Sequence, residues 1–296
     1  MRAPITKPLC GLDHMTSHSS LAAKASAFRD LHHGPELLVL PNVWDAVSAK
    51  LVEAASFRAI ATSSAGVAFA LGYPDGERIS RAEMFAAVER VAQATHLPVS
   101  ADLEHGFGDG AKNAANLARE LIAAGAIGLN LEDGTGHGAR PFKEIGQQVE
   151  EIQTIREAGS KAGVAVVINA RTDVYWEGKG TPEERFSDTV KRCVAYRDAG
   201  ADCLFVPGLR DAQTIAALVR EVAAPLNVLA GPGAPPLAEL ERLGVRRVSF
   251  GSGLMRACLG YLRGLLIGIK ASANSESIFQ NAASYEELNN LFANRA

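Results

Sequence analysis

The sequence predicts an α/β protein that folds as a (β/α)8 barrel of the TIM type. Eight short apolar runs recur along the chain, and most segments between them have the periodicity of an amphipathic helix. Eight strand-then-helix units within about 230 residues are typical of a barrel rather than an open sheet. The runs lack the alternation of half-exposed strands, which fits barrel strands buried on both faces.

A doubly wound parallel sheet is the main alternative. Such a sheet more often carries a glycine-rich phosphate-binding turn directly after its first strand. Here the first apolar run is followed by residues 41–45, with the sequence PNVWD. Glycines cluster at residues 106–110, but neither their spacing nor their position matches a dinucleotide-binding turn.

The expected strands follow one another at intervals that leave room for a helix after each. Their length suits strands that are buried in a barrel. They are residues 37–40, 59–62, 97–101, 127–131, 164–169, 203–206, 226–230 and 245–250.

Three of the expected helices carry recognisable end signals. Ser80 and Glu83 form a capping box at the start of one helix. Thr181 and Glu184 form another, with a proline at the first helical position between them. Gly125 is expected to end a third helix, because glycine readily adopts the left-handed backbone that terminates helices.

We expect one catalytic domain with an extension at each end of the chain. Residues 1–25 are expected to be a flexible N-terminal tail, and they contain no apolar stretch typical of a secretory signal. Residues 26–272 are expected to form the barrel, and residues 273–296 a C-terminal helical extension. The tract 254–269 is too charged to span a bilayer. Its apolar residues cover more than one helix face, which predicts burial against a partner subunit in a homodimer or homotetramer.

Charge and cysteine content exclude several classes of protein. The formal net charge is -3, so we expect no general attraction to nucleic acid or to an anionic membrane. The four cysteines are scattered without metal spacing, which favours a reducing, cytoplasmic environment. Two of them, Cys193 and Cys203, lie in apolar patterns and are expected to be inert core thiols; the others are Cys10 and Cys258.

Acidic residues follow the second, third and fourth predicted strands. They would lie at the carboxyl-terminal end of the barrel, where barrel enzymes have their active sites. Asp102 and Glu104 lie just past the third strand, and their i, i+2 spacing sends both side chains the same way. Glu132 ends the next strand and Asp75 lies on the loop after the second. Such a set of carboxylates predicts a site for a hard divalent cation such as Mg²⁺ or Mn²⁺. The alternative is that these acids cap helices or are solvated in loops.

A further group of polar residues follows the fifth strand. Arg171 offers a planar fork that suits a carboxylate or phosphonate, so cation and arginine together would bind a small dianionic 2-oxo acid. Arg171 could instead be an internal salt-bridge partner, and Asp173 is expected to cap the following helix. Asn169 could simply satisfy backbone groups, and Asp133 could form a solvated loop pair with Glu132.

Five segments resemble the isocitrate lyase/phosphoenolpyruvate mutase superfamily, and the resemblance extends over residues 37–268. The segments are residues 62–68 (TSSAGVA), 71–75 (LGYPD), 101–108 (ADLEHGFG), 128–133 (GLNLED) and 169–173 (NARTD). The resemblance implies a barrel that binds Mg²⁺ or Mn²⁺ and makes or breaks C–C or P–C bonds in 2-oxo acids or their phosphono relatives. It also implies a tetramer in which paired subunits exchange a C-terminal helix.

The resemblance also implies roles for individual residues. Asp102 would bind the metal directly, and Glu104, Glu132 and Asp75 would hold it largely through waters. The backbone of residues 63–65 would cradle the carboxylate and oxo oxygen of the substrate. The implied substrate-binding residues are Trp44, Asp45, Ser63, Ser64, Ala65, Asn130, Asn169 and Arg171, and the candidate catalytic residues are Asp75, Arg171, Thr135 and His137.

Two departures from the family pattern bear on the reaction. Glu104 stands where relatives usually carry Asp, and its longer side chain can still reach a water-mediated position. The loop of residues 134–140 lacks the Lys-Lys/Arg-Cys-Gly-His motif of the lyases for isocitrate and methylisocitrate, and also the Lys and Asn of the mutases. Thr135, His137 and Arg140 are the groups that this loop offers instead.

These features predict a Mg²⁺-dependent enzyme that acts on a small 2-oxo (di)carboxylate, such as oxaloacetate, through a metal-stabilised enolate. The expected reaction is C–C cleavage by a lyase or decarboxylase. One alternative is a phosphonopyruvate-type P–C mutase or hydrolase, similar to phosphoenolpyruvate mutase or carboxyphosphonoenolpyruvate mutase. Another is a non-catalytic protein that binds a 2-oxo acid.

Overall fold

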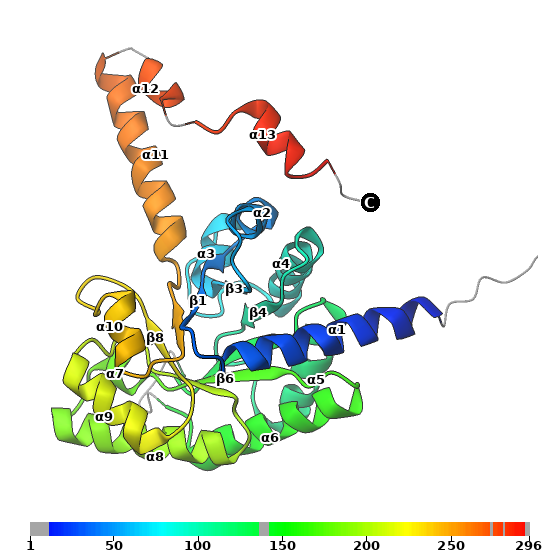
Figure 1. Ribbon diagram of the computed structural model, residues 1–296, viewed down its shortest axis with the longest axis vertical. Helices are drawn as coiled ribbons and strands as arrows, with labels where there is room; N and C mark the ends of the chain where they lie inside the picture. The colour runs from blue at the N-terminus through cyan, green and yellow to red at the C-terminus, as the bar shows by residue number, and fades with distance from the viewer. Residues whose placement is uncertain (1–11, 136–141, 273–274, 281, 294–296) are drawn as a thin grey trace, which may run out of the picture.

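We describe a computed structural model of the chain, which covers residues 12–135, 142–272, 275–280 and 282–293. A parallel barrel is surrounded by helices, and a long helix projects away from it (Figure 1). The predicted TIM-type α/β fold is confirmed. No helix in these four stretches combines the length and apolar character needed to span a membrane.

Every predicted strand region contains a strand, and all neighbouring strands are parallel. The order across the sheet is β1-β9-β8-β7-β6-β5-β4-β3-β2. The strands are β1 (Leu38–Leu40), β2 (Asn42–Val43), β3 (Ile60–Thr62), β4 (Val99–Asp102), β5 (Gly128–Glu132), β6 (Val167–Arg171), β7 (Cys203–Phe205), β8 (Leu226–Leu229) and β9 (Arg247–Ser249).

The barrel closes through the segment that contains β1 and β2. The first half of this segment pairs with β9 and the second half pairs with β3. Pro41 separates the two halves, and it has no backbone N–H to donate to a ladder, although its carbonyl oxygen still accepts from Ala61 N at 3.1 Å. β1 and β2 therefore act as one strand that changes partner at Pro41, so the barrel has eight strand positions.

Helices follow most strands, and the three predicted end signals are confirmed. Both capping boxes form, at Ser80 and at Thr181, and Gly125 follows the third helix with a φ of +82°. The helices are α1 (Leu12–Leu31), α2 (Ala46–Ala54), α3 (Ser64–Ala70), α4 (Arg81–Ala94), α5 (Gly110–Ala123), α6 (Ile145–Lys161), α7 (Val174–Glu177), α8 (Pro182–Asp198), α9 (Ala212–Val222), α10 (Leu237–Arg242), α11 (Gly253–Ser272), α12 (Glu276–Phe279) and α13 (Tyr285–Asn290).

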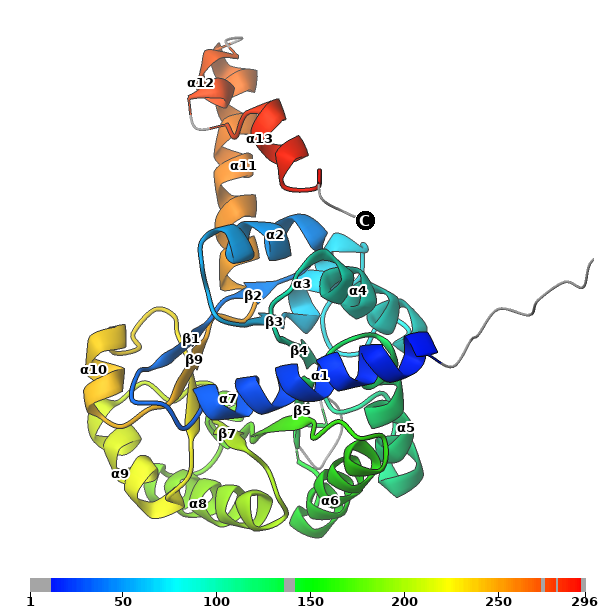
Figure 2. The ribbon, with the colours of Figure 1, turned by 45° about the vertical axis from the view of Figure 1, so that its right-hand side comes forward.

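α1 occupies much of the segment that was expected to be a flexible tail, so that expectation is wrong from Leu12 onward. The helix lies across the barrel (Figure 2) and covers its amino-terminal end. Phe28 is fully buried there beside Gly128, the first residue of β5. Arg29 on the same helix pairs with Asp202 at 2.7 Å, just before β7. Burial of the apolar face of α1 therefore closes one end of the barrel and leaves the other end for ligands.

α11 projects from the barrel with α12 near its far end, and the chain then turns back to α13 (Figure 1). Several of its large apolar side chains are exposed, among them Leu262, Leu266 and Ile267. Apolar side chains on one chain's surface usually mark a contact with another molecule when they form a contiguous set.

Candidate active site

A cavity of about 280 Å³ opens at the carboxyl-terminal end of the barrel. This is the end at which barrel enzymes place their active sites, because the loops after all eight strands meet there. Several residues that were predicted from the sequence line it together: Ser63, Ser64, Ala65, Asp75, Asp102, Asn130 and Arg171.

Asp102, the last residue of β4, is held by donors from two neighbouring elements. Ser64 donates to its Oδ2 through both the backbone N–H, at 3.0 Å, and the side-chain Oγ, at 2.8 Å. Asn130 Nδ2 on β5 donates to the other oxygen at 3.2 Å. Ser63 caps α3 by accepting from Gly66 N, which fixes the turn that presents Ser64. The carboxylate of Asp102 is thus oriented at the cavity wall.

Glu104 is buried with one unsatisfied oxygen. Its Oε2 accepts from Glu77 N at 2.7 Å, whereas no described group donates to its buried Oε1. Burial, together with the negative charges of Asp102 and Asp75, raises the pKa of Glu104 to about 8. Its backbone has a φ of +50°, a left-handed conformation that is uncommon outside glycine.

Asp75 adds a further carboxylate to the same wall. Asp75 is exposed overall, but partial desolvation of its carboxyl group, together with the nearby negative charge of Asp102, raises its pKa. The carboxylates of Asp75, Asp102 and Glu104 therefore repel one another in a region of reduced solvation, and a bound cation would relieve that repulsion.

Arg171 lines the cavity, but carboxylates of the chain already engage all three of its nitrogens. Nη1 lies 2.5 Å from Glu132 Oε2, while Nε and Nη2 contact the two oxygens of Asp173 at 2.6 and 3.0 Å. Burial alone would lower the pKa of Arg171, yet these carboxylates outweigh it and raise the pKa overall. Burial raises the pKa of Glu132 well above its usual value, although Arg171 opposes the change.

Asp173 does not have the helix-capping contact that was predicted for it. It occupies the N-cap position of α7, but its side chain makes no capping hydrogen bond. The side chain pairs with Arg171 instead, while its backbone N–H donates to Asp133 Oδ1 at 3.0 Å. The prediction was wrong because a charged partner two residues earlier binds the carboxylate more strongly than a backbone N–H does.

Asp133 is also buried, so the alternative of a solvated loop pair with Glu132 is wrong. Its Oδ2 accepts from Tyr196 at 2.7 Å and pairs with Arg192 at 3.1 Å. These contacts direct the Asp133 side chain toward α8 and away from the residues that line the cavity.

Trp44 and Asp45 were expected at the mouth of the cavity, but neither is among the described residues that line it. Asp45 is exposed and caps α2, accepting from Ser48 N at 2.7 Å. Trp44 is half-buried close to Gly66, where an added Cβ would come within 3.1 Å of Trp44 Cβ. Both residues therefore support the start of α2 and α3 from outside the cavity.

Asn169 lies below the cavity rather than in its lining. Its Nδ2 donates to Asn130 Oδ1 at 2.7 Å, and its own Oδ1 is buried without a described partner. Thr135 is likewise absent from the described lining. His137 and Arg140 lie outside the described residues, so their predicted roles stay predictions.

The acidic residues fit a divalent cation that keeps several waters. In the part of the chain that the structure describes, no three Asp, Glu, His or Cys side chains are grouped so that they could all hold one metal ion. Mg²⁺ in proteins is usually bound by one or two carboxylates plus waters. The Glu104 Oε1, which has no described donor, and the oriented Asp102 carboxylate are suited to that arrangement. The negative charge of Asp75 acts on Glu104, and Glu132 is close enough to interact with both Asp102 and Glu104.

The loop after β4 is tied to the loop before α4 through Glu77, which sequence reasoning missed. Glu77 accepts from Phe107 N at 2.7 Å, and its other carboxylate oxygen lies 2.9 Å from His105 Nε2. Glu77, Glu104 and Phe107 all have positive φ values. No sequence spacing marks Glu77, because the contact joins two loops that are distant along the chain.

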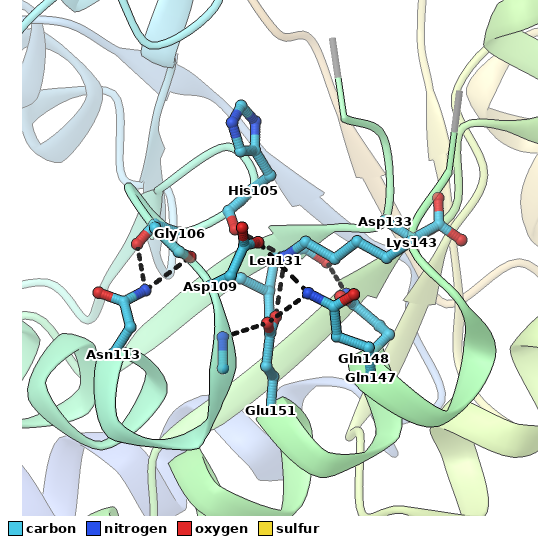
Figure 3. A network of polar contacts seen from close by, with 12 residues as sticks. His105, Gly106, Asp109, Asn113, Leu131, Asp133, Lys143, Gln147, Gln148 and Glu151 are labelled. Carbon is cyan, nitrogen blue, oxygen red and sulfur yellow. Dashed lines mark hydrogen bonds and ion pairs between the residues drawn. The ribbon is translucent and has the colours of Figure 1, made fainter. Parts of the chain in front are cut away.

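A buried ion pair between Lys143 and Glu151 holds the same loop from its other side (Figure 3). Lys143 Nζ lies 2.8 Å from Glu151 and donates to the carbonyl oxygen of His105 at 2.8 Å. Glu151 on α6 also accepts from Gly110 N at 3.1 Å. The pair therefore connects α6 and the segment after β5 to the loop that carries Glu104.

Two further arginines line the cavity and were not predicted as site residues. Arg210 lies in the loop after β7, and Arg256 lies in the first turns of α11. Apolar residues surround them on the same side, including Phe205, Leu229 and Phe250. A single exposed arginine carries no sequence signal of its own, so only the closure of the barrel brings these residues to the cavity.

Comparison with known proteins places the chain among enzymes of one family. The family model for phosphoenolpyruvate phosphomutase matches residues 28–269. The uncharacterized protein Rv1998c of Mycobacterium tuberculosis is 36% identical over 226 residues, which cover 76% of this chain and 82% of that protein. Oxaloacetate decarboxylase 2 of Pseudomonas putida (strain W619) is 30% identical over 228 residues, covering 75% of this chain and 72% of the relative.

Solved structures give the same result. A lyase/mutase-like protein from Burkholderia cenocepacia J2315 superimposes with a TM-score of 0.86 at 40% identity, covering 93% of this chain and 97% of the other. Phosphonopyruvate hydrolase in complex with oxalate and Mg²⁺ superimposes with a TM-score of 0.79 at 25% identity, covering 90% and 94%. The chain therefore belongs to the phosphoenolpyruvate phosphomutase family, within the isocitrate lyase/phosphoenolpyruvate mutase superfamily.

Proposed function

We propose that this protein is a Mg²⁺-dependent enzyme that breaks a C–C bond in a small 2-oxo acid, as a lyase or decarboxylase. The observation that carries the proposal is the group of three carboxylates formed by Asp75 and Asp102, which line the cavity, and Glu104, whose buried Oε1 has no partner among the described residues. Oxaloacetate decarboxylase 2 and the oxalate and Mg²⁺ complex of phosphonopyruvate hydrolase support the same substrate class.

The residues of the chain would bind and orient the 2-oxo acid. A divalent cation held by Asp102 and Glu104 supplies Lewis-acid stabilisation of negative charge on the 2-oxo oxygen. Ser64 keeps the Asp102 carboxylate in one orientation through its N–H and Oγ. The N–H groups of Ser63 and Ser64 donate to Val43 O and to Asp102, so in this segment the N–H of Ala65, which also lines the cavity, is the group that suits the substrate carboxylate.

The apolar side of the cavity would exclude water from the bond that breaks. In a decarboxylation the C–C bond to the leaving carboxylate breaks, and its electron pair moves toward the 2-oxo group. A proton then adds to the carbon that lost the carboxylate. Phe205 and Leu229 line this side, and reduced solvation strengthens the electrostatic stabilisation of the developing charge.

The reaction proposed excludes efficient cleavage of isocitrate or methylisocitrate. Those reactions need an acid to protonate the succinate fragment, and residues 134–140 contain no cysteine. Burial raises the pKa of both Cys193 and Cys203, so neither thiol ionises near neutral pH. Loss of a general acid typically costs about 10²–10⁴-fold in rate.

A panel of substrates supplied with Mg²⁺ tests the proposal. Oxaloacetate, phosphonopyruvate, isocitrate and methylisocitrate would be followed by release of pyruvate, CO₂, phosphate or glyoxylate. We expect turnover of a small 2-oxo acid and at most trace cleavage of isocitrate or methylisocitrate. Phosphate release from phosphonopyruvate alone would instead identify a P–C hydrolase. Mg²⁺-dependent binding without turnover of any compound would favour a binding protein.

A further inference from the structure

The acidic and basic side chains that line the cavity come from different sides of the barrel. Its acidic lining residues are Asp102 at the end of β4 and Asp75 in the segment between β3 and β4, whereas Arg210 follows β7 and Arg256 follows β9. In a closed barrel of eight positions, β7 lies across from β3, and β7 and β9 are each three positions away from β4. A ligand whose head contacts the acidic wall would therefore extend toward the two arginines.

Arg210 and Arg256 differ from Arg171 in having no oppositely charged partner among the described residues. Carboxylates occupy the nitrogens of Arg171. Within the described part of the chain, no side-chain hydrogen bond or ion pair involves Arg210 or Arg256, and both are exposed at the cavity. Arg210 lies against Gly233, where an added Cβ would come within 3.5 Å of its Cδ. Two unpaired guanidinium groups on one wall are well suited to an anionic group of a ligand.

We propose that Arg210 and Arg256 form a second anion subsite, which binds the distal acidic group of a dianionic 2-oxo acid. The proposal rests on the proposed function, because the acidic wall must hold the 2-oxo acid head of the same ligand. The distal group is a carboxylate or a phosphonate, since both accept hydrogen bonds from a guanidinium fork. The apolar residues Phe205 and Leu229 would contact the carbon atoms near that group.

Binding of three probes in the presence of Mg²⁺ tests this subsite by calorimetry. Pyruvate carries only the head group, 3,3-difluorooxaloacetate adds a carboxylate, and phosphonopyruvate adds a phosphonate. The variants are Arg210→Gln, Arg256→Gln and the matched control Arg220→Gln. Arg220 is an exposed residue of α9 that is not among the residues lining the cavity, so the control removes one positive charge elsewhere.

We expect each cavity variant to weaken binding of at least one dianionic probe about tenfold or more, equivalent to about 1.4 kcal/mol. Binding of pyruvate should change by less than about twofold, a small fraction of the same scale. The dianionic probe that loses more affinity identifies the preferred distal group. Arg220→Gln should leave all three affinities unchanged.

Three results would overturn the subsite. In the first, the cavity variants lose no more affinity for either dianionic probe than Arg220→Gln does. In the second, they lose affinity for pyruvate equally, which would indicate a general effect on the site. In the third, neither dianionic probe binds the unsubstituted protein more tightly than pyruvate. The proposed function survives all three, whereas absence of Mg²⁺-dependent binding of every probe would overturn it as well.

Discussion

Glu104 is the residue whose environment conflicts most with its charge. It is buried beside two other carboxylates, and one of its oxygens is unsatisfied. Such a conflict destabilises the fold unless the residue serves a function. The conflict is resolved if a divalent cation binds beside Glu104.

We therefore expect Glu104→Gln to raise the melting temperature of metal-free protein, because the substitution removes repulsion with Asp102 and Asp75. The same variant should bind Mg²⁺ about 10–100-fold more weakly, as is typical when a supporting group of a metal site is lost. Thermal melts with and without Mg²⁺ measure both effects. A variant that is less stable without metal, and is stabilised by Mg²⁺ as much as the unsubstituted protein, would argue against this role.

His32 provides an independent prediction about pH. Its Nδ1 lies 2.8 Å from the carbonyl oxygen of Phe28, which can only accept, so Nδ1 carries the proton. Nε2 faces Arg247 Nη1 at 3.5 Å and acts as an acceptor. Burial and the positive charge of Arg247 lower the pKa of His32 from 6.5 to about 3, while Asp202 opposes and His33 reinforces the shift.

The unfolded chain therefore takes up a proton on His32 at a higher pH than the folded protein does. This contribution lowers the free energy of unfolding as pH falls below 6.5, by about 2 kcal/mol between about pH 7.5 and about pH 5. Urea unfolding across this range measures it. His32→Gln cannot titrate there and should show a flatter dependence; equal slopes for the two proteins would contradict the assignment.

At the residue scale, the sequence predicted the acidic wall better than the arginines. Asp102 and Glu104 could be placed because strand-end position and i, i+2 spacing are local properties of the chain. The pairing of Arg171 with Glu132 and the position of Arg210 depend on which strands become neighbours or face each other. No local pattern records those relationships.

At the scale of elements, the Lys143–Glu151 pair links α6 to the loop that carries Glu104 (Figure 3). Both side chains are 3% exposed. Removing one member of such a pair leaves a buried charge without compensation, which typically costs about 3–5 kcal/mol. We expect this loss for Lys143→Met and for Glu151→Gln in urea unfolding.

The double substitution Lys143→Met with Glu151→Leu separates stability from positioning. An apolar pair should recover most of the lost stability, but it cannot donate to the carbonyl oxygen of His105 as Lys143 does. We expect Mg²⁺ affinity to stay reduced in the double variant. Recovery of both stability and metal affinity would show that the pair has no influence on the loop.

The elements themselves were largely predictable, with α1 as the main exception. Apolar runs located the strands, and capping residues located the starts of α4 and α8. α1 was missed because its first half is rich in Ser, Thr and His. Its stability as a helix depends on burying Phe28 at the end of the barrel, which is a tertiary effect.

At the scale of the whole molecule, the exposed apolar side chains of α11 predict self-association. Leu266 is 58% exposed and Ile267 63% exposed on a helix that projects from the barrel. We expect a homodimer or homotetramer in sedimentation velocity at micromolar concentration, because a second chain would bury this surface. Leu262→Glu with Leu266→Glu should shift the protein toward monomer. A monomeric unsubstituted protein would refute the prediction.

The barrel could be recognised from the sequence as a whole, because eight repeats of one unit leave few alternative architectures. Its closure at Pro41 could not be recognised, since the exchange of partners from β9 to β3 is visible only when all strands are placed. The same holds for the segregation of charge across the cavity, which arises from the order of strands around the barrel.

Titration of the protein with Mn²⁺ in the presence of oxalate, followed by electron paramagnetic resonance, tests most directly whether the acidic wall is a divalent cation site. We expect one bound ion per chain in the unsubstituted protein, displaced by Mg²⁺, and loss of this binding in Asp102→Asn, because Asp102 is the oriented carboxylate at the centre of the wall. The metal site would be contradicted if the unsubstituted protein bound no Mn²⁺, or if Asp102→Asn bound Mn²⁺ as tightly as the unsubstituted protein does.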